Sequence, residues 1–312
     1  MTLDTIISNN RPVIRPSRMQ KLIVILGPTA SGKTGLAIRL AKKFQGEIVS
    51  ADSRQVYKGL DIGTAKPTKR ERRSISHHLL DVVSPKKRYT VVRYQKTARK
   101  AIQDIQRMGK LPLLVGGSPL YIYAVVDGWV MPKVAPSRKL RVQLEKLTTV
   151  QLLNKLKKLD PRRVRTIEQK NRRRLIRALE IVLSTGKPIP QLKKVPLPYP
   201  VLFLGISRSS HELKKRIKKR FLKILKQGFL NEIKALRKQG LSWKRIEEFG
   251  LEYREVSQYL QGKISKKEMI EIVVKATVDF ARRQMTWFKK DPRIHWITNA
   301  READRLISRL LD

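Results

Sequence analysis

The sequence of 312 residues contains no cysteine. This absence excludes disulfide bonds, thiolate zinc sites and cysteine nucleophiles. Acidic residues are also scarce, because 25 Asp and Glu stand against 70 Lys and Arg, which gives a formal net charge of +45 at pH 7. A chain this basic favours an anionic partner, with nucleic acid as the first candidate and an anionic membrane surface as the second. A halo of solvated lysines is the alternative interpretation.

Long apolar runs are missing as well. No run approaches the roughly 20 residues that a membrane-spanning helix requires. Residues 1–20 lack the apolar core and small-residue cleavage site of a secretory signal, so we interpret them as a flexible N-terminal arm. Hydrophobic residues still make up 41% of the chain, which is enough for a buried core. We therefore expect a cytoplasmic protein that is not bound to a membrane.

Short apolar runs recur along the chain and predict buried strands. They cover residues 21–26, 46–50, 111–115 and 201–207. Helical patterns lie between them, including a basic helix at residues 91–108. Strands that alternate with helices predict an α/β fold, with a parallel sheet that is flanked by helices on both faces.

The pattern changes between residues 132 and 195. Strand signals disappear there, and strongly charged helical sequence replaces them. We therefore predict a core formed by residues 21–131 and 196–312, with an all-helical insertion at residues 132–195.

The strongest motif is GPTASGKT, which matches G-x-x-x-x-G-K-[ST] between a predicted strand and a predicted helix. Its residues are Gly27, Pro28, Thr29, Ala30, Ser31, Gly32, Lys33 and Thr34. In such a P-loop, backbone N–H groups and a helix N-terminus surround phosphate oxygens. Lys33 adds a positive charge, and the Thr34 hydroxyl can bind Mg²⁺. The motif predicts a phosphate chain as ligand, such as ATP, GTP or a prenyl diphosphate.

An acidic residue follows a different strand from the one expected of an ordinary P-loop ATPase. The strand at residues 111–115 continues into Gly-Gly-Ser-Pro without an acid, whereas Asp52 follows the strand at 46–50. Because ligands bind beyond the carboxyl ends of parallel strands, we expect the P-loop, Asp52 and Ser118 to converge. Asp52 is then a general base or a water-mediated Mg²⁺ ligand, or alternatively a helix cap or turn residue.

Seven segments together carry a family resemblance. They are GPTASGKT, SADSRQVYKGLDIGTAKP, HHLLDVVSP, LLVGGSPLYI, NRRRLIRALEI, GLEYREV and FARRQMTWFKKD. In this order they resemble the tRNA dimethylallyltransferases, the bacterial-type isopentenyltransferases of the IPP transferase family. The resemblance covers residues 21–297 and implies a P-loop NTPase-like core with a helical insertion. It also implies transfer of a dimethylallyl group from its diphosphate to N6 of adenosine 37, beside the tRNA anticodon.

The resemblance further implies roles for individual residues. The P-loop would hold dimethylallyl diphosphate, with Mg²⁺ at Thr34 and Arg220 as an additional diphosphate ligand. Asp52 would accept the proton of N6, and Ser118 and Lys33 complete the catalytic set. The insertion would contact the anticodon stem-loop, and we expect a monomer. The tRNA-binding residues implied are Asp52, Ser53, Arg54, Gln55, Ser118, Arg141, Arg173, Arg174, Leu175, Ile176 and Arg177.

Three other functions stay open. A P-loop small-molecule or nucleotide kinase is disfavoured by the missing acid after residue 115. A catalytically silent RNA-binding relative is disfavoured by intact Lys33, Thr34 and Asp52. A prenyltransferase for free adenine nucleotides is a close variant, but the insertion and the basic charge favour tRNA.

Two further groups of residues are expected to be structural. Adjacent His77 and His78 would point to opposite faces of a strand, so we expect packing or hydrogen bonding rather than metal binding. We expect Trp243, Trp287 and Trp296 in the core rather than as platforms for stacked bases.

Overall fold

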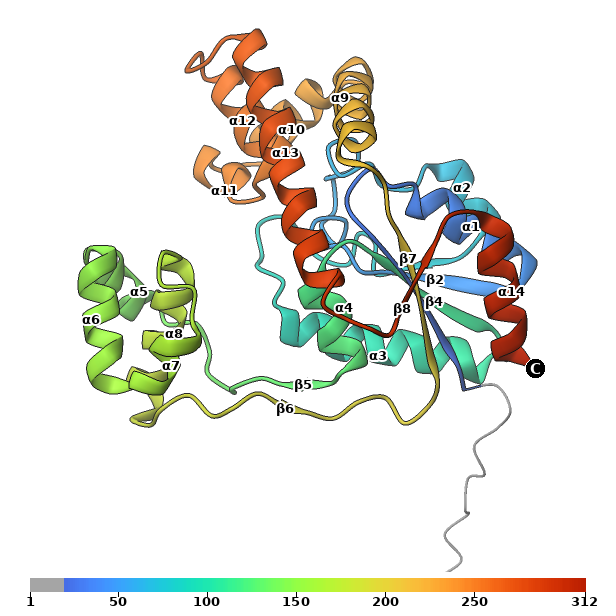
Figure 1. Cartoon of the computed structure of the whole chain (residues 1–312). Helices are drawn as coiled ribbons and strands as arrows, with labels where there is room; N and C mark the ends of the chain where they lie inside the picture. The colour runs from blue at the N-terminus through green and yellow to red at the C-terminus, as the bar shows by residue number, and fades with distance from the viewer. Residues whose placement is uncertain (1–19) are drawn as a thin grey trace, which may run out of the picture. The chain divides into compact units, whose positions relative to one another are not determined.

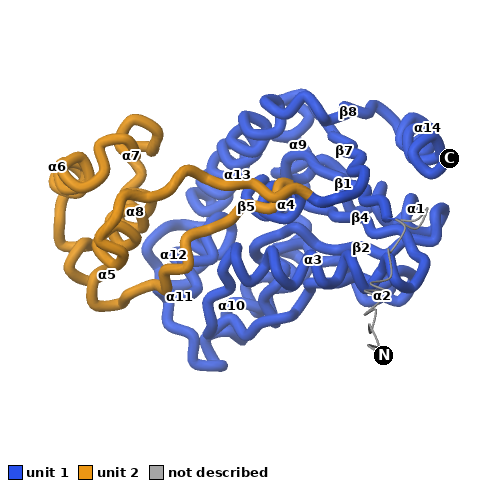
Figure 2. The backbone as a smooth tube through the Cα atoms, turned by 90° about the horizontal axis from the view of Figure 1, so that it is seen from below, with its two compact units in different colours: residues 1–126, 197–312 blue, residues 127–196 orange. Residues whose placement is uncertain are grey.

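The computed structural model describes residues 20–312, so residues 1–19 of the expected arm lie outside the described residues. The chain divides into two compact units. Unit 1 contains the chain up to Val126 and Leu197–Asp312, and unit 2 contains Asp127–Pro196, as the two colours of Figure 2 show. Unit 2 thus begins and ends a few residues outside the range 132–195 that the sequence suggests. None of the described helices is both long and apolar enough to cross a membrane.

Unit 1 is built on a six-stranded sheet in which all neighbouring strands are parallel (Figure 1). In their order across the sheet, the strands are β3 (His77–His78), β2 (Gly46–Ser50), β4 (Leu111–Gly116), β1 (Leu22–Leu26), β7 (Val201–Ile206) and β8 (Ile294–Ile297). The four inner strands match the four predicted apolar runs, which confirms the parallel α/β fold. The edge strand β8 has no such run and was not predicted, whereas β3 consists of His77 and His78, which were expected on a strand although they form no apolar run.

Helices cover both faces of this sheet. The helices of unit 1 are α1 (Lys33–Lys43), α2 (Lys69–Ser74), α3 (Val91–Arg107), α4 (Pro119–Val126), α9 (Ser210–Lys226), α10 (Phe229–Lys238), α11 (Trp243–Glu247), α12 (Leu251–Leu260), α13 (Lys266–Phe288) and α14 (Ala300–Leu311). Leu40 of α1 and Ile307 of α14 share a core with Ile23 and Ile25 of β1. The connections β1–β2 and β3–β4 run in opposite directions across the sheet, so right-handed crossovers place α1 and α3 on opposite faces.

The helices α9 to α13 pack against one another within unit 1. Helix α13 packs against α9 and α12, and α10 packs against α9 and α12. Ser209 caps the N-terminus of α9, and Ser265 forms a capping box with Glu268 at the start of α13. Because α9 begins shortly after β7 ends, the chain carries this helix to the carboxyl edge of the sheet.

The three tryptophans are less buried than expected. Trp243 and Trp296 are only partly buried, and Trp287 is 44% exposed. The Arg237 guanidinium lies 4.7 Å from the Trp243 ring centroid, and the Trp287 ring lies beside that of Tyr123 at 6.4 Å. One face of each of these two rings therefore packs on the protein without reaching the core.

Unit 2 consists mostly of helices. Its elements are β5 (Trp129–Val130), α5 (Arg138–Glu145), α6 (Thr149–Leu159), α7 (Pro161–Thr166), α8 (Arg172–Thr185) and β6 (Lys193–Lys194). The helices enclose a core of their own that includes Leu144, Leu152 and Leu179. β5 and β6 pair as a short antiparallel ladder. Unit 2 therefore contains two short strands as well as helices, whereas the sequence predicted helices alone.

Two glycines of unit 1 differ in the space that is available for a side chain. A Cβ on Gly116, at the end of β4, would lie 2.2 Å from the backbone oxygen of Ala51, which follows β2. A Cβ on Gly35, in the first turn of α1, would meet nothing within 4 Å. The ends of β2 and β4 therefore approach each other at a distance that only glycine at position 116 allows.

We expect Gly116→Ala to lower the free energy of unfolding by about 2 kcal/mol, because the backbone of β2 or β4 must shift. Gly35→Ala is the matched control, and we expect it to raise the free energy of unfolding by about 0.5 kcal/mol. Urea unfolding of both variants and the parent protein measures the difference. Equal effects from the two substitutions would contradict the close approach at Gly116.

Candidate functional site

A pocket of about 1070 Å³ lies in unit 1 at the carboxyl edge of the sheet. The P-loop, the segment after β2, the end of β4 and the helices α9, α12 and α13 line it. The predicted residues that line this pocket are Thr29, Ala30, Gly32, Lys33, Thr34, Asp52, Ser53, Arg54, Gln55, Ser118 and Arg220. The structure thus brings together the phosphate-binding motif, the acid and the hydroxyl that the sequence places on separate strands.

The P-loop adopts its turn because glycine and one alanine take left-handed backbone angles. Gly32 has φ +102° and Ala30 has φ +62°. A Cβ on Gly27 would lie 2.6 Å from the backbone oxygen of Ile206, so the loop starts directly against β7. Gly27, Pro28 and Ser31 do not line the pocket, and the Ser31 side chain is fully buried beneath the loop.

Lys33 lies folded back over the loop. Its Nζ donates hydrogen bonds to the backbone oxygens of Gly27 at 3.0 Å and Pro28 at 2.6 Å. Burial, and to a lesser extent the nearby Arg220 guanidinium, lowers the pKa of Lys33 to about 8, although the Asp52 carboxylate acts in the opposite direction. A phosphate group in the pocket would offer this ammonium group a stronger partner than the two carbonyls.

Two arginines of α9 reach the P-loop from one side of the helix. Arg216 Nε donates to the backbone oxygen of Ala30 at 2.8 Å, and Arg220 Nη1 donates to Thr29 Oγ1 at 3.0 Å. The two positions are four residues apart, which places both side chains on one face. Arg220 Nη2 also forms an ion pair of 2.6 Å with the buried carboxylate of Glu252 on α12. Glu252 thereby fixes the direction of the Arg220 fork.

Gln284 of α13 ties the P-loop to the end of β4. Its Oε1 accepts a hydrogen bond from the Thr29 N–H at 2.9 Å, and its Nε2 donates to the backbone oxygen of Gly117. The side chain is only 4% exposed. Sequence reasoning missed Gln284, Arg216 and Glu252, although the four-residue spacing of Arg216 and Arg220 on a basic helix was a signal for one of them.

Asp52 occupies the turn directly after β2. Its Oδ1 accepts hydrogen bonds from the backbone N–H groups of Arg54 at 2.8 Å and Gln55 at 3.3 Å. Among the described residues no hydrogen bond reaches Asp52 Oδ2, and the residue lines the pocket. The turn role and the base role are therefore compatible, because one carboxylate oxygen holds the turn while the other is available to a ligand.

Gln55 is anchored through both atoms of its side-chain amide. Its Oε1 accepts from Ser50 Oγ at 3.0 Å, and its Nε2 donates to the backbone oxygen of Thr64 at 3.3 Å. An amide offers two N–H donors and two lone pairs on oxygen, so one donor and one lone pair stay available at the pocket.

In unit 2, two arginines that were predicted to bind tRNA form ion pairs with a buried glutamate. Arg141 donates from Nε and Nη2 to Glu180 at 2.9 Å each, and Arg177 Nη1 donates to the same carboxylate at 2.6 Å. Glu180 is fully buried. Both arginines therefore neutralise an internal charge, and their guanidinium groups are already engaged within the unit.

Of the other α8 residues that were predicted to bind tRNA, two lie in the core and two lie on the surface. The side chains of Leu175 and Ile176 lie in the core of unit 2, which excludes them from contact with a ligand on the surface. Arg173 and Arg174 are exposed, and Arg174 has a loose ion pair of 3.5 Å with the exposed Glu168. Of the predicted segment 173–177, these two arginines present a charge to an external partner.

The two histidines have different neighbours. His77 lines the pocket and its Nδ1 contacts the backbone oxygen of Ile75 at 2.8 Å, whereas His78 Nε2 contacts the Glu47 carboxylate at 2.6 Å. Within the described residues, no three His, Asp or Glu side chains are clustered as a metal site. The Thr34 hydroxyl and the Asp52 carboxylate are hard oxygen donors in the pocket, and this donor set fits Mg²⁺ that is shared with a bound phosphate chain.

Comparison with known proteins identifies a family. Residues 55–291 match the model of the family described as IPP transferase, so the matched range begins after the P-loop and Asp52. A tRNA dimethylallyltransferase of Roseiflexus sp. (strain RS-1) is 44% identical over 88% of this chain and 92% of its own length. A tRNA dimethylallyltransferase of Cyanothece sp. (strain PCC 7425) is also 44% identical, over 88% of this chain and 91% of its own.

Solved structures show the same similarity. The full-length tRNA isopentenylpyrophosphate transferase of Bacillus halodurans has a TM-score of 0.70 and 33% identity, covering 93% of this chain and 96% of that chain. A eukaryotic dimethylallyltransferase acting on tRNA has a TM-score of 0.72 and 32% identity, covering 86% of this chain and 69% of that chain.

The lowered pKa of Lys33 predicts a pH dependence of anion binding. A bound diphosphate raises the pKa of Lys33, so binding at pH 8 without divalent cations should take up about half a proton at this residue. Affinity should fall as the pH rises above 8, because the free protein then loses the Lys33 charge. Calorimetry in two buffers of different ionisation enthalpy measures the uptake, with Lys33→Met as the control. Uptake of the same size in Lys33→Met would contradict the assignment to Lys33.

Proposed function

The chain belongs to the IPP transferase family, and we propose that it transfers a dimethylallyl group from dimethylallyl diphosphate to N6 of adenosine 37 in tRNA. Prenyl transfer to tRNA is the activity named for its relatives, which are 38–44% identical over most of the chain. The observation that carries the proposal is the meeting of the P-loop, Arg220 and Asp52 in one pocket.

The donor half of the reaction needs stabilisation of a leaving diphosphate. The bond between the allylic carbon and the diphosphate oxygen breaks, and the diphosphate leaves with the electron pair. The backbone N–H groups of the P-loop, the Lys33 ammonium group and the Arg220 guanidinium then face the increased negative charge. The Arg220 guanidinium stands in place before the reaction, because Thr29 and Glu252 hold it.

The acceptor half needs an amine that becomes more nucleophilic as it reacts. The N6 lone pair of adenine is delocalised into the ring, and it forms the new bond to the allylic carbon as N6 loses a proton. Of the acids that line the pocket, Asp52 is the one whose carboxylate we propose as the acceptor of this proton. The donor and lone pair left on Gln55 are the pair of groups that an amide uses to bind an adenine edge.

We propose Mg²⁺ as the cofactor, held by the Thr34 hydroxyl and the diphosphate. When bound, the ion supplies positive charge that stabilises the leaving diphosphate.

The RNA partner proposed is the anticodon stem-loop of tRNA. A loop base leaves its stack at a lower cost than a paired base, which suits a pocket that must enclose adenine. The exposed Arg173 and Arg174 of unit 2 are the contacts that we propose for RNA phosphates. We further propose that the protein works as a monomer in the cytoplasm.

The kinase alternative finds no support in the pocket. The residues after β4 that line it are Gly117 and Ser118, where an ordinary P-loop ATPase has an acid.

We expect Asp52→Ala and Asp52→Asn both to lower the rate of prenyl transfer by roughly 10²–10⁴. Asp52→Asn keeps an oxygen for the N–H groups of Arg54 and Gln55, so it separates loss of the base from loss of the turn. The measurement is transfer of labelled dimethylallyl groups to tRNA, together with tRNA affinity. Near-normal binding is expected, and a loss of rate below tenfold in Asp52→Asn would exclude Asp52 as the base.

The double variant Arg173→Ala/Arg174→Ala should weaken tRNA binding and reduce the salt dependence of the affinity, because fewer counterions are released. Arg177→Gln is the contrasting variant. It should lower the stability of the protein by about 2 kcal/mol, because Glu180 loses a charged donor. Filter binding at several salt concentrations and urea unfolding separate the two effects. Unchanged binding in the double variant would place the RNA contacts elsewhere.

A further inference from the structure

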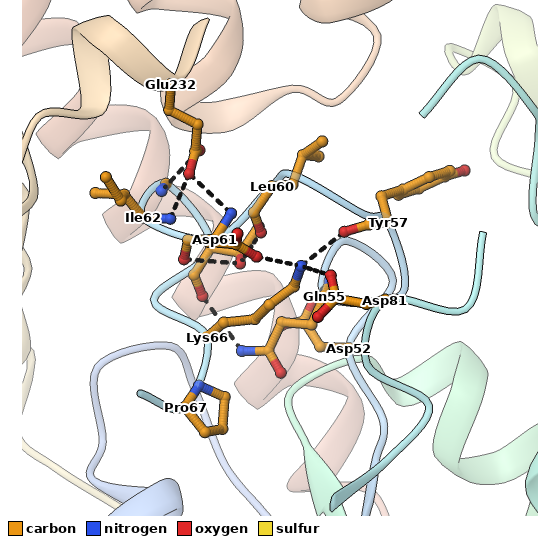
Figure 3. A network of polar contacts seen from close by, with 12 residues as sticks. Asp52, Gln55, Tyr57, Leu60, Asp61, Ile62, Lys66, Pro67, Asp81 and Glu232 are labelled. Atoms are coloured by element: carbon orange, nitrogen blue, oxygen red, sulfur yellow. Dashed lines mark hydrogen bonds and ion pairs between the residues drawn. The ribbon is translucent and has the colours of Figure 1, made fainter. Parts of the chain in front are cut away.

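One carboxylate outside the pocket holds the backbone of a loop that lines it. Glu232, on α10, accepts hydrogen bonds from three successive N–H groups, those of Asp61 at 2.8 Å, Ile62 at 2.6 Å and Gly63 at 3.2 Å (Figure 3). The Tyr253 hydroxyl of α12 donates to the same carboxylate at 2.6 Å. Burial and the Glu232 charge hold the pKa of Tyr253 well above its usual range, so the hydroxyl keeps its proton.

The loop also packs tightly on the helices that carry these two residues. A Cβ on Gly63 would lie 2.3 Å from the Phe229 ring and 2.7 Å from the Tyr253 ring. Only glycine allows the backbone to approach the two rings this closely. Packing and hydrogen bonding therefore fix the same three residues against α10 and α12.

Lys66 fixes the other end of the loop. Its Nζ donates to the Tyr57 backbone oxygen at 2.7 Å, to Asp61 Oδ1 at 2.7 Å and to Asp81 Oδ1 at 2.6 Å (Figure 3). The side chain is 1% exposed, and these three acceptors use all the donors of the ammonium group. Residues 60–66 are thus held from both sides, and we call this segment the clamped loop.

The clamped loop connects this network to the acceptor side of the pocket. Gly63, Thr64 and Ala65 line the pocket, but Glu232 does not. The Thr64 backbone oxygen accepts from Gln55 Nε2, and the Gln55 N–H donates to Asp52 Oδ1. A shift of the loop backbone therefore changes the position of Gln55 and, through it, the turn that holds Asp52.

We propose that Glu232 is a positioning residue for the acceptor base of the reaction. This inference rests on the proposed function. Glu232 does not line the pocket and acts through the clamped loop on Gln55 and Asp52, whereas its partner Tyr253 lines the pocket and supports Glu232 through the hydroxyl group. The P-loop takes part in none of these hydrogen bonds, since the side chains that contact it from other elements are those of Arg208, Arg216, Arg220 and Gln284. We therefore expect loss of Glu232 to act on the step that aligns adenine N6 with the donor carbon.

The test is Glu232→Gln in the full-length protein. A glutamine has one acceptor oxygen where the carboxylate has two, so it loses either the Asp61 and Ile62 bonds or the Gly63 and Tyr253 bonds. We expect kcat for tRNA prenylation to fall roughly ten- to a hundredfold, with the KM for dimethylallyl diphosphate within twofold of the parent value. Tyr253→Phe removes one hydrogen bond and should lower kcat by about three- to tenfold.

Glu248→Gln is the matched control. Glu248 lies in the same group of helices and pairs with Arg88 and Arg245, and among the described residues it forms no hydrogen bond with the clamped loop. The control should keep kcat close to the parent value. An equal loss of kcat in Glu248→Gln would show that general weakening of this region, rather than the clamp, limits the reaction.

Amide hydrogen exchange of residues 61–63 tests the clamp independently of activity. We expect at least about tenfold faster exchange in Glu232→Gln. Faster exchange with unchanged kcat would overturn the proposal, because the clamp would then be structural only. A fall in activity that comes from the KM for dimethylallyl diphosphate would also overturn it. Absence of prenyl transfer in the parent protein would instead refute the proposed function, while hydrogen exchange would still report on the clamp.

Discussion

In-register pairing of parallel strands determines where the P-loop, Asp52 and Ser118 lie. Leu26 at the end of β1 pairs with Gly116 of β4, and Ser50 at the end of β2 pairs with Val115 of the same strand. The three strands therefore end at one level, so the P-loop, Asp52 and Ser118 begin from the same edge. Gly116 lets β2 and β4 remain close at this point. The chemistry of the pocket depends on this pairing, because none of these groups reaches another along the chain.

Several of the few acids of this basic chain are buried in ion pairs. The buried Glu180, Glu252, Glu255 and Glu47 each form an ion pair with Arg or Lys. Such carboxylates compensate cations inside the fold or at the pocket. Most of the remaining positive charge lacks an acidic counterpart, because Lys and Arg exceed Asp and Glu by 45. The excess suits a polyanionic partner.

The sequence predicted features that are encoded locally. The inner strands are apolar on both faces, and the P-loop is a contiguous motif, so both could be identified without a structure. The edge strands are short and contain polar residues, His77 in β3 and His295 in β8, so neither forms an apolar run in the sequence. Gln284 meets the P-loop from 255 residues away, and no local pattern reports that contact. Arg141 and Arg177 look like RNA ligands until the position of Glu180 is known, because a basic side chain does not reveal its partner.

The first turn of α12 serves both halves of the pocket at once. Glu252 pairs with Arg220 on the donor side, and its neighbour Tyr253 donates to Glu232 on the acceptor side. Successive residues on a helix point about 100° apart, so one rigid turn can direct two side chains to different walls. Bond formation between adenine N6 and the donor carbon requires the two substrates at near-contact distance. A shared helical turn keeps the two walls at a fixed separation, which a pair of independent loops would not do.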